Sequence, residues 1–247
     1  MLDERFWARY FRVYDTLNAA APYRHLLEDI CNELDIRNGE KILDAGCGTG
    51  NLALLIKEKG GEVTCLDNCT AALEIYKKKD AVANIVLADL RKRLPFSDNY
   101  FDKIASNNTL YLLSKREQQK VISEFKRVLK VGGKVVLSEP KSGGSSFKIY
   151  ISAIKEEIKE NGISEAVLKI TSLFIPVIKI LYYNLIIKRE RSEHFFRAGE
   201  QEKLLTEAGF SVVTSDREVY TNQAILVTGK KLCNGTLNKT QKAIKSN

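Results

Sequence analysis

Histidine is scarce in this sequence, and the cysteines lack the spacing of a metal site. Only two histidines and five cysteines occur among the 247 residues, and no two cysteines form a C-x-x-C pair. Because structural zinc sites use closely spaced Cys and His ligands, no zinc site is expected, and no other metal is predicted. The cysteines are typical of reduced, small hydrophobic residues in a cytoplasmic protein. The residues concerned are Cys31, Cys47, Cys65, Cys69, Cys233, His25 and His194.

Long uncharged apolar runs are also missing. The first ten residues, MLDERFWARY, hold two acids and two arginines, so they lack the apolar region of a signal peptide. In the most apolar stretch, residues 163–187, Lys169 and Lys179 limit the uncharged run to 170–178. Pro176 is expected to kink a helix formed by this stretch. A membrane-spanning helix needs about 20 apolar residues. We therefore expect no transmembrane segment, and only a peripheral membrane contact remains open.

The positive charge is concentrated at one end of the chain. The net charge is +8, but residues 230–247 hold five lysines and no acid, which leaves the rest at about +3. This balance does not by itself indicate a nucleic-acid partner. The segment is polar and has no periodic apolar face, so residues 231–247 are predicted to form a basic, disordered tail.

Strand-like and helix-like patterns alternate from residue 40 onward. Beta runs separated by helices predict a parallel sheet with right-handed crossovers. The end of the chain, 208–231, instead holds two strands with no room for a helix, so a terminal hairpin adds an antiparallel strand. The predicted fold class is α/β: a doubly wound, mostly parallel seven-stranded sheet with a C-terminal antiparallel hairpin. Strands are expected at 40–45, 62–67, 83–89, 101–107 and 134–139, and helices at 50–59, 70–79 and 114–130, the last stopped by Gly132-Gly133.

Two further segments flank or interrupt this core. Residues 1–38 carry aromatic residues at helical spacing and predict two helices, an N-terminal helical cap. Residues 141–199 open with the flexible KSGGSS and continue as apolar helix, which we interpret as a helical lid over the carboxyl edge of the sheet. The solvent-exposed end of this lid is expected at Lys188, Arg189 and Arg191. The core is then 39–140 with 200–230, and the tail is 231–247.

A glycine-rich turn follows the first strand in KILDAGCGTG, residues 41–50. Such a turn lets the backbone approach a ligand closely and directs helix N–H groups at it. A dinucleotide fold needs G-x-G-x-x-G, which counted from Gly46 requires glycine at position 51, where the chain has Asn51. The spacing excludes a dinucleotide site, and with it oxidoreductase activity.

Carboxylates end the next two strands. Asp67 lies 21 residues after Gly46, and a carboxylate there can accept hydrogen bonds from both hydroxyls of a ribose. Asp89 ends the third strand and could receive an adenine amino group, with Leu90 packing nearby. The alternative for each is a solvated strand-end acid.

Five ordered segments together resemble the class I S-adenosylmethionine-dependent methyltransferases. They are ILDAGCGTG, LD at 66–67, AD at 88–89, LPFSDNYFDKI at 94–104 and FKRVLKVGGKVVLSEP at 125–140. The resemblance covers roughly 40–140 plus the terminal hairpin, and it departs at Val131, where the family has proline. It implies a Rossmann-like methyltransferase fold and S-adenosylmethionine as cofactor. RVYDTLNAA at 12–20 further resembles the entry segment of the ubiquinone and menaquinone C-methyltransferases.

The resemblance also implies which residues hold the cofactor. Asp44 and the loop 46–50 should bind its methionine end, Asp67 its ribose, and Asp89 with Leu90 its adenine. Asn107 should line the pocket after the fourth strand. Tyr14 should cap it, or else be a core aromatic residue, and Cys47 should be a small turn residue and not a nucleophile. The full cofactor-binding set is Tyr14, Asp44, Gly46, Cys47, Gly48, Thr49, Gly50, Asp67, Asn68, Asp89, Leu90 and Asn107.

The sequence indicates the methyl acceptor less clearly than the cofactor. Methyl transfer from a sulfonium is an in-line displacement that needs alignment and exclusion of water, and a base only when the acceptor arrives protonated. No catalytic motif is present, and the candidate bases are Glu139 and His194, the latter with a structural alternative. The apolar 163–187 stretch favours a small apolar or amphiphilic acceptor such as a quinol, a lipid or a secondary metabolite. The same stripe could pack on the sheet or form a dimer interface, so the chain is expected to be a monomer or homodimer.

Two other functions compete with small-molecule methylation. The basic tail favours an RNA or protein methyltransferase, but the body has no appended RNA-binding module and no aromatic-basic stripe. After the fourth strand the chain reads SNNTL and not an N-P-P-Y-type tetrapeptide. A catalytically silent partner subunit is opposed by the intact glycine loop and both strand-end acids.

Overall fold

Seven strands form a single sheet in the order β3-β2-β1-β4-β5-β7-β6. All neighbours pair in parallel except β7, which is antiparallel to both β5 and β6. The computed structural model describes residues 2–189 and 194–233, and it confirms the predicted sheet and terminal hairpin. The strand order reverses between β1 and β4, so a crevice opens at the carboxyl ends of these strands. The strands are β1 (Lys41–Ala45), β2 (Glu62–Asp67), β3 (Asn84–Leu87), β4 (Phe101–Asn107), β5 (Leu129–Pro140), β6 (Phe210–Val219) and β7 (Ala224–Lys231).

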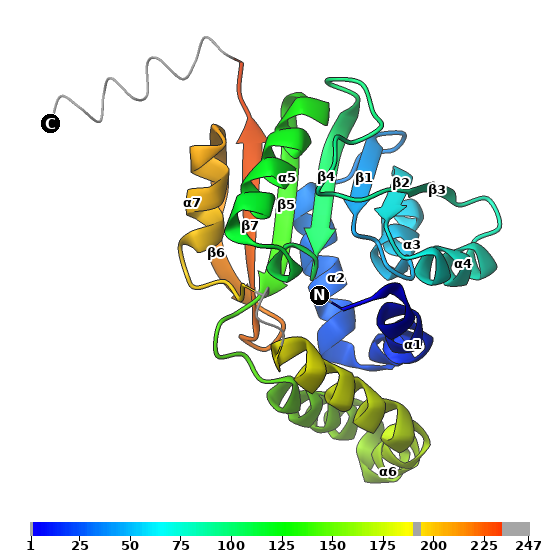
Figure 1. Cartoon of the computed structure of the whole chain (residues 1–247). Coiled ribbons are helices and arrows are strands. Elements are labelled where there is room, and N and C mark those ends of the chain that lie inside the picture. Colours follow the sequence, from blue (N-terminus) through cyan, green and yellow to red (C-terminus); the bar gives the residue numbers. More distant parts are fainter. Residues whose placement is uncertain (1, 190–193, 234–247) are drawn as a thin grey trace, which may run out of the picture.

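Helices cover both faces of the sheet because successive strand residues point to opposite sides. Ile42 and Val136 pack in one buried cluster with residues of α2 and α3, whereas Leu43 and Val135 pack in the other with residues of α5 and α7. Figure 1 shows α5 and α7 in front of the sheet and α2 behind it. The helices of these layers are α2 (Ala21–Leu34), α3 (Asn51–Glu58), α4 (Thr70–Lys79), α5 (Lys115–Val128) and α7 (Glu200–Glu207).

The end of α5 differs from the prediction. Ser114 and Glu117 form a capping box that starts the helix where expected, but the helix ends at Val128. Leu129 is already extended, fully buried and paired with Phe101, so β5 begins before the two glycines. Burial of Leu129 in the core therefore ends the helix, and Gly132-Gly133 lie within β5.

Two segments lie beyond the carboxyl edge of the sheet. Figure 1 shows α1 (Glu4–Tyr14) and α6 (Ser146–Arg189) below the edge at which β4 and β5 end. Between α1 and α2 runs a short 3-10 turn, η1 (Asp15–Ala19), and a second one, η2 (Leu110–Leu112), follows β4. Most of residues 4–34 are thus helical, and α1 and η1 line the crevice at the strand-order reversal.

The lid is a helical hairpin, not one kinked rod. The backbone of α6 leaves helical geometry at Gly162 (φ 84°, ψ 171°) and stays helical at Pro176, where the sequence had predicted the kink. The two arms run antiparallel, because Lys169 pairs with Glu157 and the Asn184 Nδ2 donates to the Ser146 Oγ at 3.2 Å. Arg191 and the tail from residue 234 lie outside the described residues.

By length and composition α6 could cross a membrane, which the sequence argument from its lysines did not anticipate. Its most apolar 18-residue stretch has a mean hydropathy of 1.8, and only 11% of that stretch is buried in the fold. A core helix would be largely buried, so most of this apolar surface has no partner within the described part of the chain. The chain reverses at Gly162, and contacts between the two arms of α6, and between the second arm and α1, hold both arms against the protein.

Candidate cofactor and acceptor site

The loop after β1 depends on glycine at each predicted position. Gly46, Gly48 and Gly50 have φ values of 81°, 53° and 76°, in the left-handed region. A Cβ on Gly48 would lie 2.9 Å from the Phe11 ring, and one on Gly50 only 2.1 Å from the Tyr76 ring. Tight packing of α1 and α4 against the loop therefore allows no side chain at these positions.

Gly50→Ala is expected to destabilise the fold by more than the strain of a positive φ alone, because the buried Tyr76 ring must move. The left-handed strain costs about 1–2 kcal/mol, and the displaced ring adds a packing cost of roughly 1–3 kcal/mol. Gly132 is the matched control: its φ is 83°, but a Cβ there meets nothing within 4 Å. Urea unfolding of both variants measures the difference, and equal losses would contradict the packing described here.

Two buried carboxylates, Asp44 and Asp67, lie near the carboxyl ends of the neighbouring strands β1 and β2. Asp44 is 1% exposed and its Oδ2 has no hydrogen-bond partner among the described residues. Burial first, and then the charge of Asp67, raise the pKa of Asp44 to about 7. A buried carboxylate oxygen without a donor is costly, so its position is one that a ligand donor would stabilise.

Asp67 is already tied to the glycine loop. Its Oδ2 accepts from the N–H of Gly48 at 2.8 Å, and its Oδ1 accepts from the N–H of Cys69 at 2.9 Å. Burial raises the pKa of Asp67, while these backbone N–H groups act to lower it. Because a carboxylate oxygen accepts more than one hydrogen bond, each oxygen keeps capacity for a hydroxyl.

Asp89 reaches the same cavity, but it has a partner that the sequence did not indicate. The Arg91 guanidinium binds both of its oxygens, with Nη2 to Oδ2 at 2.7 Å and Nε to Oδ1 at 2.9 Å. This guanidinium lowers the pKa of Asp89. An adenine amino group would therefore share or replace one of these hydrogen bonds.

These residues line one cavity of about 470 Å³ at the carboxyl edge. Thr49 and Gly50 are not among its lining residues, because the Thr49 hydroxyl turns away and donates to the Asp15 Oδ1 at 2.6 Å. The other predicted cofactor residues do line it: Tyr14, Asp44, Gly46, Cys47, Gly48, Asp67, Asn68, Asp89, Leu90 and Asn107.

The structure places neither candidate base in the cavity. Glu139 is 0% exposed, and its carboxylate accepts from three successive N–H groups after β4, those of Thr109, Leu110 and Tyr111, at 3.0–3.2 Å. Burial raises the pKa of Glu139 to about 8, although the hydrogen bonds from these N–H groups act to lower it. His194 pairs with Glu200 at 3.0 Å and is not a lining residue. Glu139 thus holds the loop after β4 in place and does not face the ligand.

Aromatic residues of α1 cover the glycine loop, and most of them were not predicted. Trp7, Tyr10 and Phe11 line the cavity beside Tyr14, whose hydroxyl lies 3.3 Å from that of Tyr23. Only Tyr10 belongs to the aromatic spacing at 6, 10 and 14 that predicted a helix. Trp7 and Phe11 form a second row with Tyr14, also at helical spacing, and neither row indicates which face the helix covers. Asn108, Thr109 and Tyr111, in the loop that Glu139 holds, also line the cavity.

Cys47 lies in the loop as a small residue. A hydrogen bond with Cys65, followed by burial, raises the pKa of the Cys47 thiol well above its usual value. The thiolate is the reactive form of cysteine, so this thiol has no nucleophilic character at neutral pH. This agrees with the turn role expected from the sequence.

The far wall of the cavity comes from α6 and is apolar. Its polar members are already engaged: Lys169 with Glu157, Lys188 with the carbonyl oxygen of Gly144, and Asn184 with Ser146. The cavity thus joins a polar end at the strand termini to an apolar end under the lid. The apolar lining residues of α6 are Ile149, Ala153, Ile154, Ala166, Ile170, Leu173, Val177, Ile180, Leu181 and Ile187.

The fold and the site resemble those of class I S-adenosylmethionine-dependent methyltransferases, and the middle of the chain matches a methyltransferase domain. Residues 43–137 match a family model described as a methyltransferase domain, which covers β1 to β5 and the whole glycine loop. A methyltransferase from Aquifex aeolicus, described as dependent on S-adenosylmethionine, has the same fold, with a TM-score of 0.56 and 17% identity over 93% of this chain and 98% of that chain.

Two curated relatives illustrate the similarity in sequence. The chain is 36% identical to the demethylmenaquinone methyltransferase of Thermotoga maritima over 123 residues, 48% of this chain and 52% of the relative. It is 41% identical to the malonyl-[acyl-carrier protein] O-methyltransferase of Buchnera aphidicola over 121 residues, 49% of this chain and 48% of the relative. The chain therefore spans about half the length of the curated relatives it matches.

Proposed function

We propose that this protein transfers a methyl group from S-adenosylmethionine to a small apolar acceptor, of which a quinol is the best-supported kind. The observation that carries the proposal is the single cavity with acids at one end and the apolar face of α6 at the other. A cofactor with a charged and a nucleoside part suits the first end, and an apolar acceptor suits the second.

The residues present fit S-adenosylmethionine. Two buried acceptor atoms without partners line the cavity, the Oδ2 of Asp44 and the Oδ1 of Asn107, and they suit the ammonium group of a methionine moiety. Asp67 has acceptor capacity for ribose hydroxyls, and the glycine loop brings N–H groups of α3 to the same place. When bound, S-adenosylmethionine supplies an electrophilic methyl group on a sulfonium.

The protein's own contribution is alignment and exclusion of water. The aromatic face of α1 and the inner face of α6 close the cavity over the strand ends. No histidine occurs among the lining residues described, and burial raises the pKa of the lining phenols Tyr10 and Tyr14, which keeps them protonated. Rate acceleration then rests on positioning, which alone can supply a large share of the barrier reduction.

The lysines of the cavity favour a quinol over a malonyl carboxylate. An anionic acceptor in an apolar cavity needs a cation that is not already paired. Lys141 pairs with Glu218 and Lys169 with Glu157, so neither charge is available without breaking an ion pair. The third lining lysine, Lys188, donates to the carbonyl oxygen of Gly144 at 2.7 Å and would have to give up that hydrogen bond. A neutral ring with an apolar substituent meets no such cost.

The test is methyl transfer from radiolabelled S-adenosylmethionine to extracted product, with two acceptors compared under reducing conditions. We expect labelling of a short-chain naphthoquinol and at least tenfold less labelling of a malonyl thioester, consistent with the roughly 1.4 kcal/mol that a factor of ten represents. Preferred labelling of the malonyl thioester would show that the acceptor is a malonyl group and not a quinol. If RNA is offered as well and it alone is labelled, the small-molecule acceptor is wrong.

Adjacent residues of α6 provide a matched pair for this assay. Leu173 lines the cavity, whereas Phe174 does not line it and is 56% exposed. Leu173→Gln should lower kcat/KM for the soluble quinol by roughly 10–100-fold, because a buried Leu side chain contributes about 1.5–3 kcal/mol. Phe174→Gln should leave it unchanged, and both variants should bind S-adenosylmethionine normally. Equal effects would show that the inner face does not hold the acceptor.

A further inference from the structure

The second arm of α6 is apolar on two faces, and only one of them has a partner within residues 2–189 and 194–233. The inner face lines the cavity, whereas the outer face is exposed to solvent. Most of the exposed apolar residues are separated by three, four or seven positions, so they lie along one side of the helix. This outer stripe consists of Val167, Leu168, Phe174, Ile175, Ile178, Tyr182 and Leu185.

The exposure of the outer stripe is high for side chains of this size. Ile175 is 64% exposed, and Tyr182 and Leu185 are each 59% exposed. A contiguous apolar patch of this kind on a protein surface marks an interaction site. We propose that the outer stripe docks on the surface of an anionic lipid bilayer.

The charges around the stripe select this partner. Residues 166–189 contain three lysines and one arginine but no acid, and of these Lys179, Lys188 and Arg189 are exposed. Apolar residues with basic residues at their rim are typical of helices that lie in the interface of an anionic membrane. A second copy docked by two-fold symmetry would bring these same cations together, which costs free energy.

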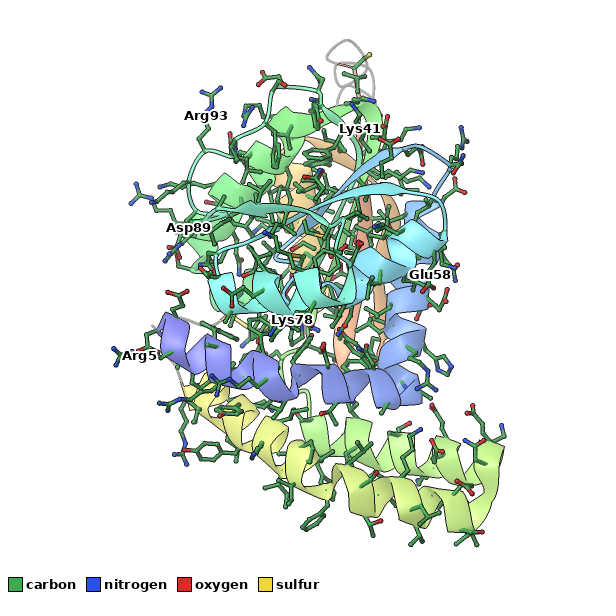
Figure 2. All side chains as sticks on the ribbon, turned by 90° about the vertical axis from the view of Figure 1, so that its right-hand side faces the viewer. Arg5, Lys41, Glu58, Lys78, Asp89 and Arg93 are labelled. Carbon is green, nitrogen blue, oxygen red and sulfur yellow. The ribbon has the colours of Figure 1, made fainter. Side chains whose placement is uncertain are left out.

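The neighbouring helix α1 adds a second basic row. Arg5, Arg9 and Arg12 are all exposed, and their spacing places them on one face of α1. Phe6 and Tyr183 are in edge-to-face contact at 5.4 Å, so α1 and the second arm of α6 lie side by side. Figure 2 shows α1 running along α6, with Arg5 pointing outward at the end of α1 near the carboxyl-terminal end of α6. Each basic residue near an anionic surface contributes about 1 kcal/mol.

The contacts of the inner face make this a peripheral contact and not a span. Asn184 bonds to Ser146 at 3.2 Å and lies 3.5 Å from the Tyr10 hydroxyl, and Ile180 and Ile187 are buried. A spanning helix would have to give up these contacts and open the cavity. Docking by the outer stripe keeps them, and it places the lid between the bilayer and the cavity. If the proposed function holds, the bilayer on which the lid docks is also the source of the apolar acceptor.

Co-sedimentation of the full chain with lipid vesicles tests the proposal without cofactor or acceptor. We expect binding to mixed phosphatidylcholine and phosphatidylglycerol vesicles, weaker binding at high salt, and little binding to phosphatidylcholine alone. The double variant Ile175→Glu/Ile178→Glu should weaken binding at least roughly tenfold, because each isoleucine contributes about 1.5–3 kcal/mol when buried. Val82→Glu is the matched control, since Val82 is 83% exposed on the core next to β3 and should not contact the bilayer.

Vesicle binding that is unchanged in the double variant would overturn the proposal. So would the absence of vesicle binding together with a dimer, seen by sedimentation velocity, that the double variant dissociates; the stripe would then contact a second copy. Affinity for S-adenosylmethionine should be the same in wild type, double variant and control. If the wild type does not bind S-adenosylmethionine, the proposed function fails, whether or not the protein binds vesicles. Failure of the docking proposal and failure of the proposed function are therefore distinguished.

Discussion

Replacing Asp67 by alanine should weaken the binding of S-adenosylmethionine at least tenfold. We assign the two Asp67 oxygens to the ribose hydroxyls, and a hydrogen bond to a charged group contributes about 1.5–3 kcal/mol. The carboxylate also anchors Gly48 and Cys69 through their N–H groups, so its loss loosens the loop that carries the rest of the site. Titration calorimetry of the folded variant measures the effect.

A fragment of the cofactor separates ribose recognition from recognition of the amino acid part. Methylthioadenosine has the ribose and adenine but lacks the amino acid part, so Asp67→Ala should weaken its binding as much as that of S-adenosylmethionine. Thermal unfolding of the variant controls for general loss of structure. Unchanged affinity for both ligands in a folded variant would refute the ribose assignment.

Asp44→Asn should have the opposite ligand profile, with S-adenosylmethionine bound roughly tenfold more weakly and methylthioadenosine bound normally. The reason is that Asp44 is assigned to the ammonium group, which only the complete cofactor carries. Because burial and the charge of Asp67 raise the pKa of Asp44 to about 7, the carboxylate is largely protonated at pH 6. Binding an ammonium group requires the ionised form, so wild-type affinity should rise roughly five- to tenfold from about pH 6 to about pH 7.5. The variant should lack this dependence.

The same substitution should raise stability at neutral and alkaline pH. The unfolded chain releases the Asp44 proton near pH 4, whereas the folded protein keeps it up to about pH 7. Between these values the folded state binds more protons, so this group's contribution to the free energy of unfolding falls as pH rises. Asparagine cannot ionise, and Asp44→Asn should therefore gain up to a few kcal/mol at about pH 8 while losing affinity. A variant that is less stable than wild type at that pH would show that the Asp44 charge is already compensated.

Local patterns predicted the parts of the site that one loop and its strand determine. The glycine positions follow from backbone conformations that other residues adopt poorly, and the strand ends at Asp44 and Asp67 follow from apolar runs that stop at an acid. The fold class and the cofactor class then followed from the order of five segments that resemble one enzyme family, whereas the order of the strands in the sheet was not predicted. These features depend on residues close together in the sequence.

Features that depend on distant residues, on side-chain geometry or on the backbone conformation of a single residue were not predictable. Glu139 ends a strand, as a ligand-binding acid would, but its three N–H donors come from a loop about 30 residues earlier. Arg91 captures Asp89 through side-chain geometry that the spacing does not indicate. In α6 the reversal falls at Gly162 and not at Pro176, because proline keeps φ in a helical range whereas glycine reaches φ 84°.

Titration calorimetry of the purified chain with S-adenosylmethionine and S-adenosylhomocysteine, repeated in the presence of a naphthoquinol, tests the central claim most directly. We expect affinity in the micromolar range for both cofactor forms, and tighter binding of S-adenosylhomocysteine when the quinol is present, because the two ligands occupy adjoining ends of one cavity. Binding of neither cofactor form by the folded protein would contradict the assignment of Asp44, Asp67 and the glycine loop, and with it the proposed methyl transfer.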